Sequence, residues 1–242
     1  MITSIIIPAY NEELLIESTV VSISEFLVET FNEGEIIIVN DGSTDSTQVV
    51  LENLIAKNSG KINLKLINNK QNRGKGYSIK QGILQSVGEV RVFMDADLPY
   101  RLEVIKEIHK RIIDDNDIVI GDRNNLESEL MNVHPIRRLA GAVYSVFVQL
   151  LVSGGITDTQ CGLKGFSAKA AKFIFPRITI DGFGFDVEVL RVGQKHAFSI
   201  SRLPVRMENN RLDSRVHLLK DSLIMLWNLV VIKRNEIIGL YD

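Results

Sequence analysis

The sequence predicts an α/β fold in which a doubly wound, mostly parallel sheet is flanked by helices. Short, continuous apolar runs alternate with longer segments of helical periodicity through the first half of the chain. Such runs are typical of strands buried on both faces, and their alternation with helices is typical of parallel sheets. The chain has 242 residues, 45% of them hydrophobic, which is enough for one large domain with a substantial core.

In the first half, strands are predicted at residues 4–10, 35–40, 62–69, 90–97 and 117–122. Helices are predicted at residues 12–31, from about 45 to 57, at 74–87 and at 101–113. Asp45 or Ser46 can cap the second helix, because either side chain can accept hydrogen bonds from amides of the first turn. This order of elements implies crossover connections and hence a doubly wound sheet.

The second half of the chain is less regular. An apolar helix is predicted at 136–153, a loop with strand edges at 155–167, a helix at 183–195, a strand at 198–207 and a helical tail from about 216 to 234. There is no internal repeat, low-complexity segment or linker. We therefore predict one large domain at residues 1–215, followed by a C-terminal amphipathic helical extension at residues 216–242.

Composition and charge exclude several classes of protein. The formal net charge is −2, so no overall positive field attracts nucleic acid. The only cysteine is Cys161, which fits a reducing compartment and excludes an intrachain disulfide. A packing role for Cys161 is favoured over a reactive thiol, because its neighbours Gln160 and Gly162 offer no proton relay.

Neither end of the chain contains a predicted membrane-spanning segment. The first residues lack the basic region and the cleavage site of a signal peptide, and they are interpreted as a strand. The longest apolar run, Leu223–Ile232, is about half of the ~20 residues that a transmembrane helix needs.

Polar clusters follow three of the predicted strands, at Pro8–Glu12, Asp41–Ser43 and Asp95–Asp97. Ligands of parallel α/β sheets bind beyond the carboxyl ends of the strands, so these clusters are expected at one site. The carboxylates of Asp95 and Asp97 repel each other unless a cation lies between them. We therefore predict that they bind Mg²⁺ or Mn²⁺, ions that prefer oxygen ligands and can bridge to a diphosphate.

A basic, glycine-rich turn at residues 73–76 precedes the helix predicted at 74–87. The glycines allow close approach of the backbone, and a helix N-terminus attracts an anion. The turn lacks the spacing of a P-loop. In the company of the acidic cluster, it is predicted to face a diphosphate.

Together these segments resemble the family 2 glycosyltransferases, which have the GT-A fold. The resemblance rests on IIIPAYNE, IIIVNDGSTDST, NRGKGYSIKQGI and FMDADL. The later segments TDTQCGLKGFS, DGFGFDVEVL and SRVHLLKDSLIMLW are similar to the polyprenyl-phosphate branch, that is, dolichyl-phosphate β-glucosyltransferases and dolichyl-phosphate mannose synthases. The resemblance covers nearly the whole chain.

The resemblance implies roles for individual residues at a donor site. The residues implied to line the base and ribose pocket are Pro8, Tyr10, Glu12 and Asp41. Lys75 and Asp95 would lie near the ribose and diphosphate, and Asp97 would be the main metal ligand with Asp95 assisting. Ser214 and Arg215 would close over the donor.

The resemblance also implies an acceptor site, in which Arg123 and Arg138 hold a phosphate. A solvent-exposed position for Arg137 and Arg138 is the alternative, because a helix start does not favour positive charge. A further acidic pair, Asp186 and Glu188, is expected to point in different directions. A structural cap is favoured for Asp186 over a role in the acceptor site.

The implied reaction is inverting transfer of a hexose from a nucleotide diphosphate sugar to a polyprenyl (dolichyl or undecaprenyl) phosphate. UDP-glucose is the expected donor, because Leu98 and Pro99 stand where mannose synthases commonly carry a metal-assisting Gln. The third metal ligand therefore stays open. A phosphate acceptor needs no strong general base, and the sequence offers no clear candidate for one.

Several other functions remain as alternatives. One is a glycan-extending family 2 enzyme with a hydroxyl acceptor, and another is a GDP-mannose-dependent mannosyltransferase. A sugar-nucleotide-binding module without activity is disfavoured by the intact Asp95 and Asp97. A sugar nucleotidyltransferase is disfavoured because residues 8–13 do not form a glycine-rich triphosphate loop.

The helical tail is predicted to lie on a membrane surface without crossing it. Together with the single cysteine, this predicts a cytoplasmic protein that is peripherally associated with the cytosolic face of a membrane. Trp227 suits an interface, and Lys220, Lys233 and Arg234 can meet anionic headgroups. The apolar stripe on this helix is expected to comprise Leu218, Leu219, Ser222, Met225, Leu226 and Leu229, widened by Leu223, Trp227 and Val230. The alternative is packing of this stripe on the domain or on a second subunit, and the oligomeric state is left open.

Overall fold

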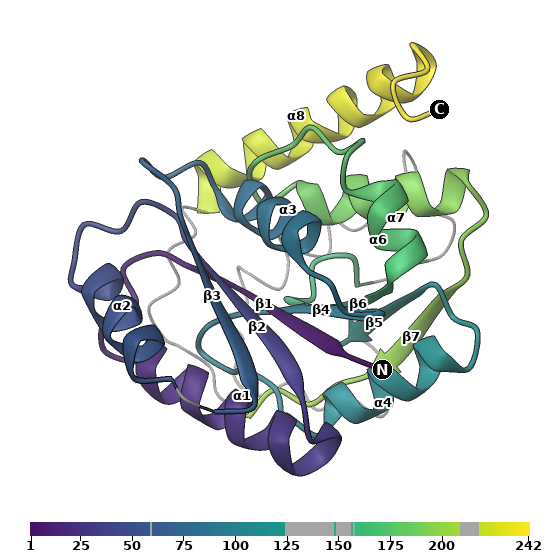
Figure 1. The fold of residues 1–242 in the computed structure, drawn as a ribbon. Helices are drawn as coiled ribbons and strands as arrows, with labels where there is room; N and C mark the ends of the chain where they lie inside the picture. Colours follow the sequence, from purple (N-terminus) through teal and green to yellow (C-terminus); the bar gives the residue numbers. More distant parts are fainter. Residues whose placement is uncertain (59, 124–147, 149–155, 157, 209–217) are drawn as a thin grey trace.

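The computed structural model describes residues 1–58, 60–123, 148, 156, 158–208 and 218–242. Seven of its strands form one sheet in the order β3-β2-β1-β4-β6-β5-β7 (Figure 1). The strands are β1 (Thr3–Ala9), β2 (Gly34–Asn40), β3 (Ile62–Asn68), β4 (Val90–Met94), β5 (Ile118–Asp122), β6 (Leu163–Ser167) and β7 (Ile200–Pro204). Every pairing is parallel except those of β6, so the predicted fold class is confirmed.

The helices cover both faces of this sheet (Figure 1). Their bounds are α1 (Ile16–Phe31), α2 (Thr47–Lys57), α3 (Lys75–Gln85), α4 (Val104–Ile113), α6 (Ala168–Ile174), α7 (Phe185–Lys195) and α8 (Leu218–Ile237). Helices α1, α2 and α4 pack with one core cluster, and α3, α6 and α7 pack with the other. The elements predicted for the first half are all present, with shifted ends.

Strand β1 explains why the core has two halves. Ile5 and Ile7 belong to the cluster under α1 and α4, whereas Ile6 belongs to the cluster under α3 and α7. Neighbouring side chains of a strand point to opposite faces, so a continuous apolar run is buried on both sides. The apolar run that opens the sequence is therefore a central strand.

Two elements of the second half differ from the prediction. Residues 155–167 were expected as a loop with strand edges, but Leu163–Ser167 form β6, which lies between β4 and β5 and is antiparallel to both. The helix α6, at residues 168–174, has no counterpart in the sequence prediction. Its N-cap is Ser167, whose hydroxyl accepts a hydrogen bond from the amide of Ala170 at 3.1 Å.

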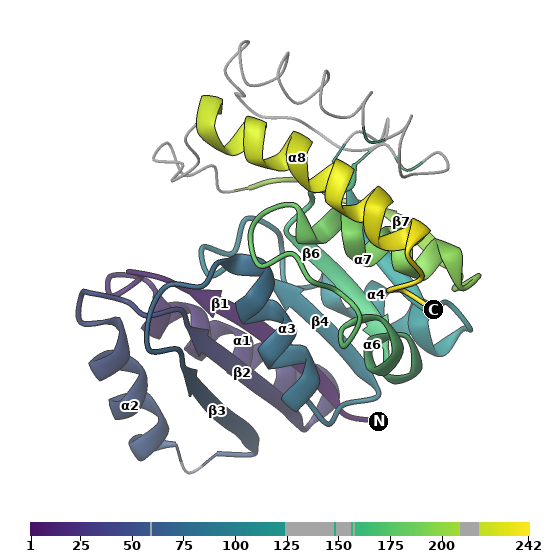
Figure 2. The same cartoon turned by 90° about the horizontal axis from the view of Figure 1, so that it is seen from above.

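Helix α8 forms an outer layer that packs on the second core cluster. Leu229 and Ile232 are buried in it, and Met225 and Leu226 pack against it. The alternative of a helix packed on the domain is therefore correct for Met225, Leu226 and Leu229. Figure 1 shows α8 and α1 on opposite sides of the sheet, and the view from above shows α8 beside α7 (Figure 2).

The outward side of α8 is also apolar. Leu223, Trp227 and Val230 are 69%, 66% and 52% exposed. Within the described residues, none of the helices combines the length and apolarity that crossing a membrane requires.

Some predictions fall outside the described residues. They are Arg138, Ser214, Arg215, the boundary between residues 215 and 216, and most of the helix at 136–153. Of that helix, only Val148 is described, and it is helical and buried.

Candidate active site

The loops that follow β1 and β2 are joined to each other by hydrogen bonds. The amide of Asn11 donates to Ser43 Oγ at 2.9 Å, and the amide of Thr44 donates to Asn11 Oδ1 at 2.8 Å. The amide of Glu12 donates to Thr47 Oγ1 at 2.7 Å. The two predicted polar clusters therefore form one surface, in which Pro8, Tyr10 and Glu12 are half-buried.

Asp41 fixes the glycine-rich turn beside this surface. Its carboxylate is 4% exposed and accepts hydrogen bonds from the amides of Arg73 (2.9 Å) and Gly74 (2.8 Å) and from the side chain of Asn69 (2.8 Å). Gly74 has φ +106°, a conformation that favours glycine. The contacts of Asp41 shape this turn, residues 73–76, which is called the donor turn here because it is predicted to face the diphosphate of a nucleotide donor. A contact of Asp41 with ribose stays a prediction.

The turn delivers Lys75 to the acidic cluster after β4. Lys75 Nζ lies 2.5 Å from Asp95 Oδ1, and both side chains are partly buried. Burial opposes the charged ammonium, but the nearby carboxylates of Asp95 and Asp186 outweigh it and raise the pKa of Lys75. Lys75 is therefore a positive charge at the first residue of α3, where the helix N-terminus adds to the attraction for an anion.

The antiparallel direction of β6 brings a further segment to the same edge. Met94, the last residue of β4, pairs with Leu163, the first residue of β6. The residues before β6 therefore lie beside Asp95. A Cβ on Gly162 would lie 2.0 Å from Asp95 Oδ2, so only glycine leaves room for this carboxylate.

A second ion pair is buried behind Lys75. Lys164 Nζ contacts Asp186 Oδ1 at 2.5 Å and the carbonyl oxygen of Cys161 at 2.7 Å. Burial raises the pKa of Asp186, and the neighbouring ammonium groups of Lys164 and Lys75 oppose that rise. The prediction that Asp186 caps its helix is wrong, because α7 has no side-chain cap and Asp186 is the partner of Lys164.

A third ion pair follows β5. The guanidinium of Arg123 donates to both oxygens of Asp158 at 2.8 Å, from Nε and Nη2. Burial opposes both charges, but the pair outweighs it, so the pKa of Asp158 is lowered and that of Arg123 is raised. Cys161, with its thiol 3.2 Å from Tyr100 Oη, is buried, as expected for a packing role.

The carboxylates of Asp95 and Asp97 suit a divalent cation that is bound together with a diphosphate. In the described part of the chain, no group of three or more His, Cys, Asp or Glu side chains is placed to hold a metal ion. Sites for Mg²⁺ commonly use one or two carboxylates and complete the shell with phosphate oxygens and water. Asp95 and Asp97 supply that number of carboxylates. The Asp95 carboxylate already forms an ion pair with the ammonium group of Lys75.

The structure thus brings together most of the predicted site residues that it describes. Lys75, Asp95 and the two joined loops form one region. Arg123 is connected to this region by the segment before β6, in which Asp158 binds Arg123 and Gly162 lies against Asp95. Residues 157–167 carry part of the family resemblance, but no role was predicted for Asp158 or Lys164. No local pattern marks a lysine that is completely buried, as Lys164 is.

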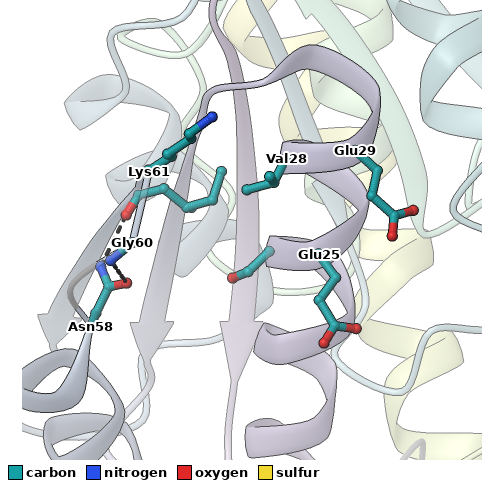
Figure 3. Close-up of a pocket in the computed structure, with 8 residues that line it drawn as sticks. Glu25, Val28, Glu29, Asn58, Gly60 and Lys61 are labelled. Carbon is teal, nitrogen blue, oxygen red and sulfur yellow. Dashed lines mark hydrogen bonds between the residues drawn. The ribbon is translucent and has the colours of Figure 1, made fainter.

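A shallow pocket elsewhere on the molecule contains none of these groups. It lies between α1 and the amino end of β3, lined by Ser24, Glu25, Val28, Glu29, Asn58, Gly60, Lys61 and Ile62 (Figure 3). This edge is opposite the carboxyl ends of the strands, where ligands of parallel sheets bind. The cluster around Asp95 therefore stays the candidate active site.

Curated relatives share most of this chain. It is 34% identical to the dolichyl-phosphate beta-glucosyltransferase of Dictyostelium discoideum over 98% of its own length and 76% of the relative. It is 32% identical to that of Saccharomyces cerevisiae over 98% of the chain and 76% of the relative. Identity to the human protein of the same name is 31%, over 84% of the chain and 66% of the relative.

Solved structures have the same fold. A glucosyl-3-phosphoglycerate synthase from Mycobacterium tuberculosis in complex with UDP superposes with a TM-score of 0.71, at 18% identity, over 96% of this chain and 80% of that chain. Another structure of that enzyme, with Mn²⁺, UDP and glucosyl-3-phosphoglycerate, gives a TM-score of 0.64 at 18% identity, over 96% of this chain and 78% of that one.

The sequence profile of Glycosyl transferase family 2 matches residues 4–175, which include the joined loops, the donor turn, Asp95 and Arg123. With more than half of the chain matched and relatives above 30% identity, the protein belongs to glycosyl transferase family 2.

Proposed function

We propose that this protein transfers glucose from UDP-glucose to a polyprenyl phosphate with inversion at the anomeric carbon. The observation that carries the proposal is the Lys75–Asp95 pair at the N-terminus of α3, beside the Asp97 carboxylate. The names of the relatives support glucose as the sugar and dolichyl phosphate as the type of acceptor.

In this proposal Lys75 and the first turn of α3 bind the diphosphate of the donor. The first turn of α3 carries no acidic residue, and its helix dipole favours an anion, while the amide of Tyr77 already donates to the carbonyl oxygen of Asp181. Lys75 adds a full positive charge that Asp95 and Asp186 hold in place. These groups stabilise the negative charge that develops as the nucleoside diphosphate leaves.

Asp95 and Asp97 would hold a Mg²⁺ or Mn²⁺ ion. When bound, that ion would neutralise charge on the diphosphate leaving group. Structures of the same fold contain Mn²⁺ together with UDP, which supports a divalent metal here. Transfer rates measured with each ion, after chelation of other metal, would show which of the two the protein uses.

Arg123 and Arg138 would bind the acceptor phosphate. Asp158 takes the Nε and Nη2 edge of Arg123, so an acceptor would approach the Nη1 group. Because Asp158 already neutralises Arg123, the pair offers directed N–H donors and little net charge, and Arg138 would supply the remaining positive charge. A phosphate acceptor is ionised near neutral pH and needs no general base.

The exposed side of α8 would rest on the membrane that contains the lipid acceptor. Leu223, Ile224, Trp227 and Val230 are exposed on it, with Lys233 and Arg234 further along. Apolar side chains flanked by basic ones favour binding in the headgroup region of an anionic bilayer. The cytosolic face of the membrane stays the expected location.

Incubation with a panel of nucleotide sugars and a polyprenyl phosphate, with lipid products read by mass spectrometry, tests the proposal. We expect a hexosyl phosphate lipid from UDP-glucose. A product only from GDP-mannose would indicate a mannosyltransferase, and sugar on a hydroxyl acceptor instead would indicate a glycan-extending enzyme.

A further inference from the structure

The donor turn rests on a loop from the second half of the chain. This loop, residues 179–182, is called the support loop here. The amide of Tyr77 donates to the carbonyl oxygen of Asp181 at 3.0 Å, and Arg73 Nη2 pairs with Asp181 Oδ2 at 3.1 Å. A Cβ on Gly74 would lie 2.6 Å from the carbonyl oxygen of Asp181. The turn that carries Lys75 is therefore in direct backbone contact with the support loop.

Gly76 extends this contact into α3. A Cβ at this position would lie 2.7 Å from the carbonyl oxygen of Ile180 and 2.6 Å from Phe185 Cβ. Further along α3, Lys80 Nζ donates to the carbonyl oxygen of Ile178 at 2.7 Å. Since backbone meets backbone at Gly74 and Gly76, a shift of the support loop must move the donor turn.

Glu188 holds the support loop from the opposite side. Its side chain is completely buried in α7, and Oε2 accepts from the amides of Thr179 (2.8 Å) and Ile180 (2.9 Å). Oε1 accepts from Thr179 Oγ1 (2.8 Å) and Tyr241 Oη (2.7 Å). A carboxylate has about four acceptor positions, so these four donors use its full capacity.

The C-terminal segment completes the arrangement. Besides the bond from Tyr241 to Glu188, Asn235 of α8 donates to Thr179 Oγ1 at 3.1 Å. Asn235 and Tyr241 are both buried, at 4% and 0% exposure. The end of the chain thus binds the same loop that supports Lys75.

We propose that Glu188 is a positioning residue for donor binding, and that Tyr241 and Asn235 couple the docking of α8 to the geometry of the donor turn. The proposal rests on the proposed function, because it assumes that the turn binds a nucleoside diphosphate. It assigns α8 a role in donor affinity in addition to any contact with the membrane.

Calorimetric titration of the full chain with UDP and Mn²⁺ tests the coupling. Glu188→Gln keeps the size of the side chain but leaves one acceptor oxygen, and Tyr241→Phe removes one donor. We expect UDP affinity to fall roughly tenfold in Glu188→Gln, since a hydrogen bond to a charged group is worth about that factor, and by a smaller factor in Tyr241→Phe. Removing a negative charge would by itself strengthen anion binding, so a loss of affinity points to geometry.

Lys195→Ala is the matched control. It removes the ion pair between Lys195 of α7 and Asp242, which also anchors the C-terminus but does not touch the support loop. UDP affinity should be unchanged in this variant. Hydrogen exchange at the amides of Thr179, Ile180 and Tyr77 should accelerate in Glu188→Gln and Tyr241→Phe but not in Lys195→Ala.

Two outcomes separate this inference from the proposed function. If Glu188→Gln and Tyr241→Phe bind UDP with the same affinity as the wild type, the inference is overturned and the donor assignment stays intact. Wild-type protein that binds no nucleoside diphosphate would overturn both the donor assignment and the role of Glu188 in donor affinity. In that case, faster exchange at Tyr77 in the variants would still establish that the loop supports the turn.

Discussion

At the scale of single residues, the site is built from charges that are matched before any ligand arrives. Lys75 pairs with Asp95, Lys164 with Asp186, and Arg123 with Asp158. A buried charge without a partner is costly, so each of these residues constrains the position of another. The roles of individual residues can therefore be separated only by substitutions that account for the partner left behind.

Asp97→Ala and Asp97→Asn should both abolish transfer, because the diphosphate leaving group loses its counter-cation. We expect kcat to fall by at least about 100-fold, and chelation of metal should stop the wild-type enzyme in the same way. Initial rates with added Mn²⁺ or Mg²⁺ after chelation measure the effect. Full turnover by the wild type in chelator would show that no metal is needed.

Gly162→Ala should damage the site while leaving the fold intact. The added Cβ would lie 2.0 Å from Asp95 Oδ2, and the end of this flexible side chain can move away more easily than backbone can. Asp95 would then shift from Lys75, and binding of Mn²⁺ and UDP should weaken by roughly tenfold or more, as for loss of a charge-assisted contact. Gly60→Ala is the control, because a Cβ there would make only an ordinary contact of 3.4 Å with Asn58 Oδ1. Equal UDP affinity in both variants would contradict the expectation.

Arg123→Ala should weaken use of the lipid phosphate and leave UDP affinity nearly unchanged, with each charge-assisted contact worth roughly 1.5–3 kcal/mol. It should also lower stability, because Asp158 stays buried without its partner. The double variant Arg123→Ala, Asp158→Asn removes that charge, so its melting temperature should recover while lipid use does not. Arg138→Ala should show the lipid defect as well, and a parallel loss of UDP binding would assign both arginines to the donor.

At the scale of elements, α8 has two apolar sides, one buried and one exposed. One side is buried on the core through Leu229 and Ile232, and the other exposes Leu223, Trp227 and Val230. Removing the whole tail would uncover the core, so substitutions on the exposed side test the membrane contact more cleanly than truncation.

Trp227→Ser combined with Val230→Ser should reduce flotation with vesicles that contain anionic lipid. The reason is the loss of apolar area that enters the interface. Leu14→Ser combined with Val49→Ser is the matched control, because both side chains are exposed apolar groups outside α8. Equal flotation of the two double variants would exclude α8 as the membrane contact.

At the scale of the whole molecule, the two joined loops, the donor turn and the segment before β6 meet at one edge of the sheet. A ligand that binds all of them should stabilise the folded state, by about 2.7 kcal/mol at a concentration 100 times its dissociation constant. With Mn²⁺ present, UDP should raise the melting temperature more than GDP at equal concentration. A clearly larger effect of GDP would favour a mannose donor.

Local patterns in the sequence predicted the parallel part of the sheet and much of the candidate site. Apolar runs identify strands buried on both faces, and parallel strands place their carboxyl ends at one edge, so Asp41, Lys75 and Asp95 were expected together. This inference needs only local periodicity and the direction of crossover connections. The ion pair of Lys75 with Asp95 agrees with it.

Only the tertiary structure decided which way β6 runs, and with it the surroundings of Asp95. The position and direction of a strand in a sheet depend on long-range pairing, which the five residues of β6 do not specify by themselves. Because β6 is antiparallel, Asp158 and Gly162 reach the site, and folding of α7 and α8 brings Glu188 and Tyr241 to the loop under Lys75. Buried polar groups of this kind form from partners far apart in the chain, and no local pattern in the sequence marks them.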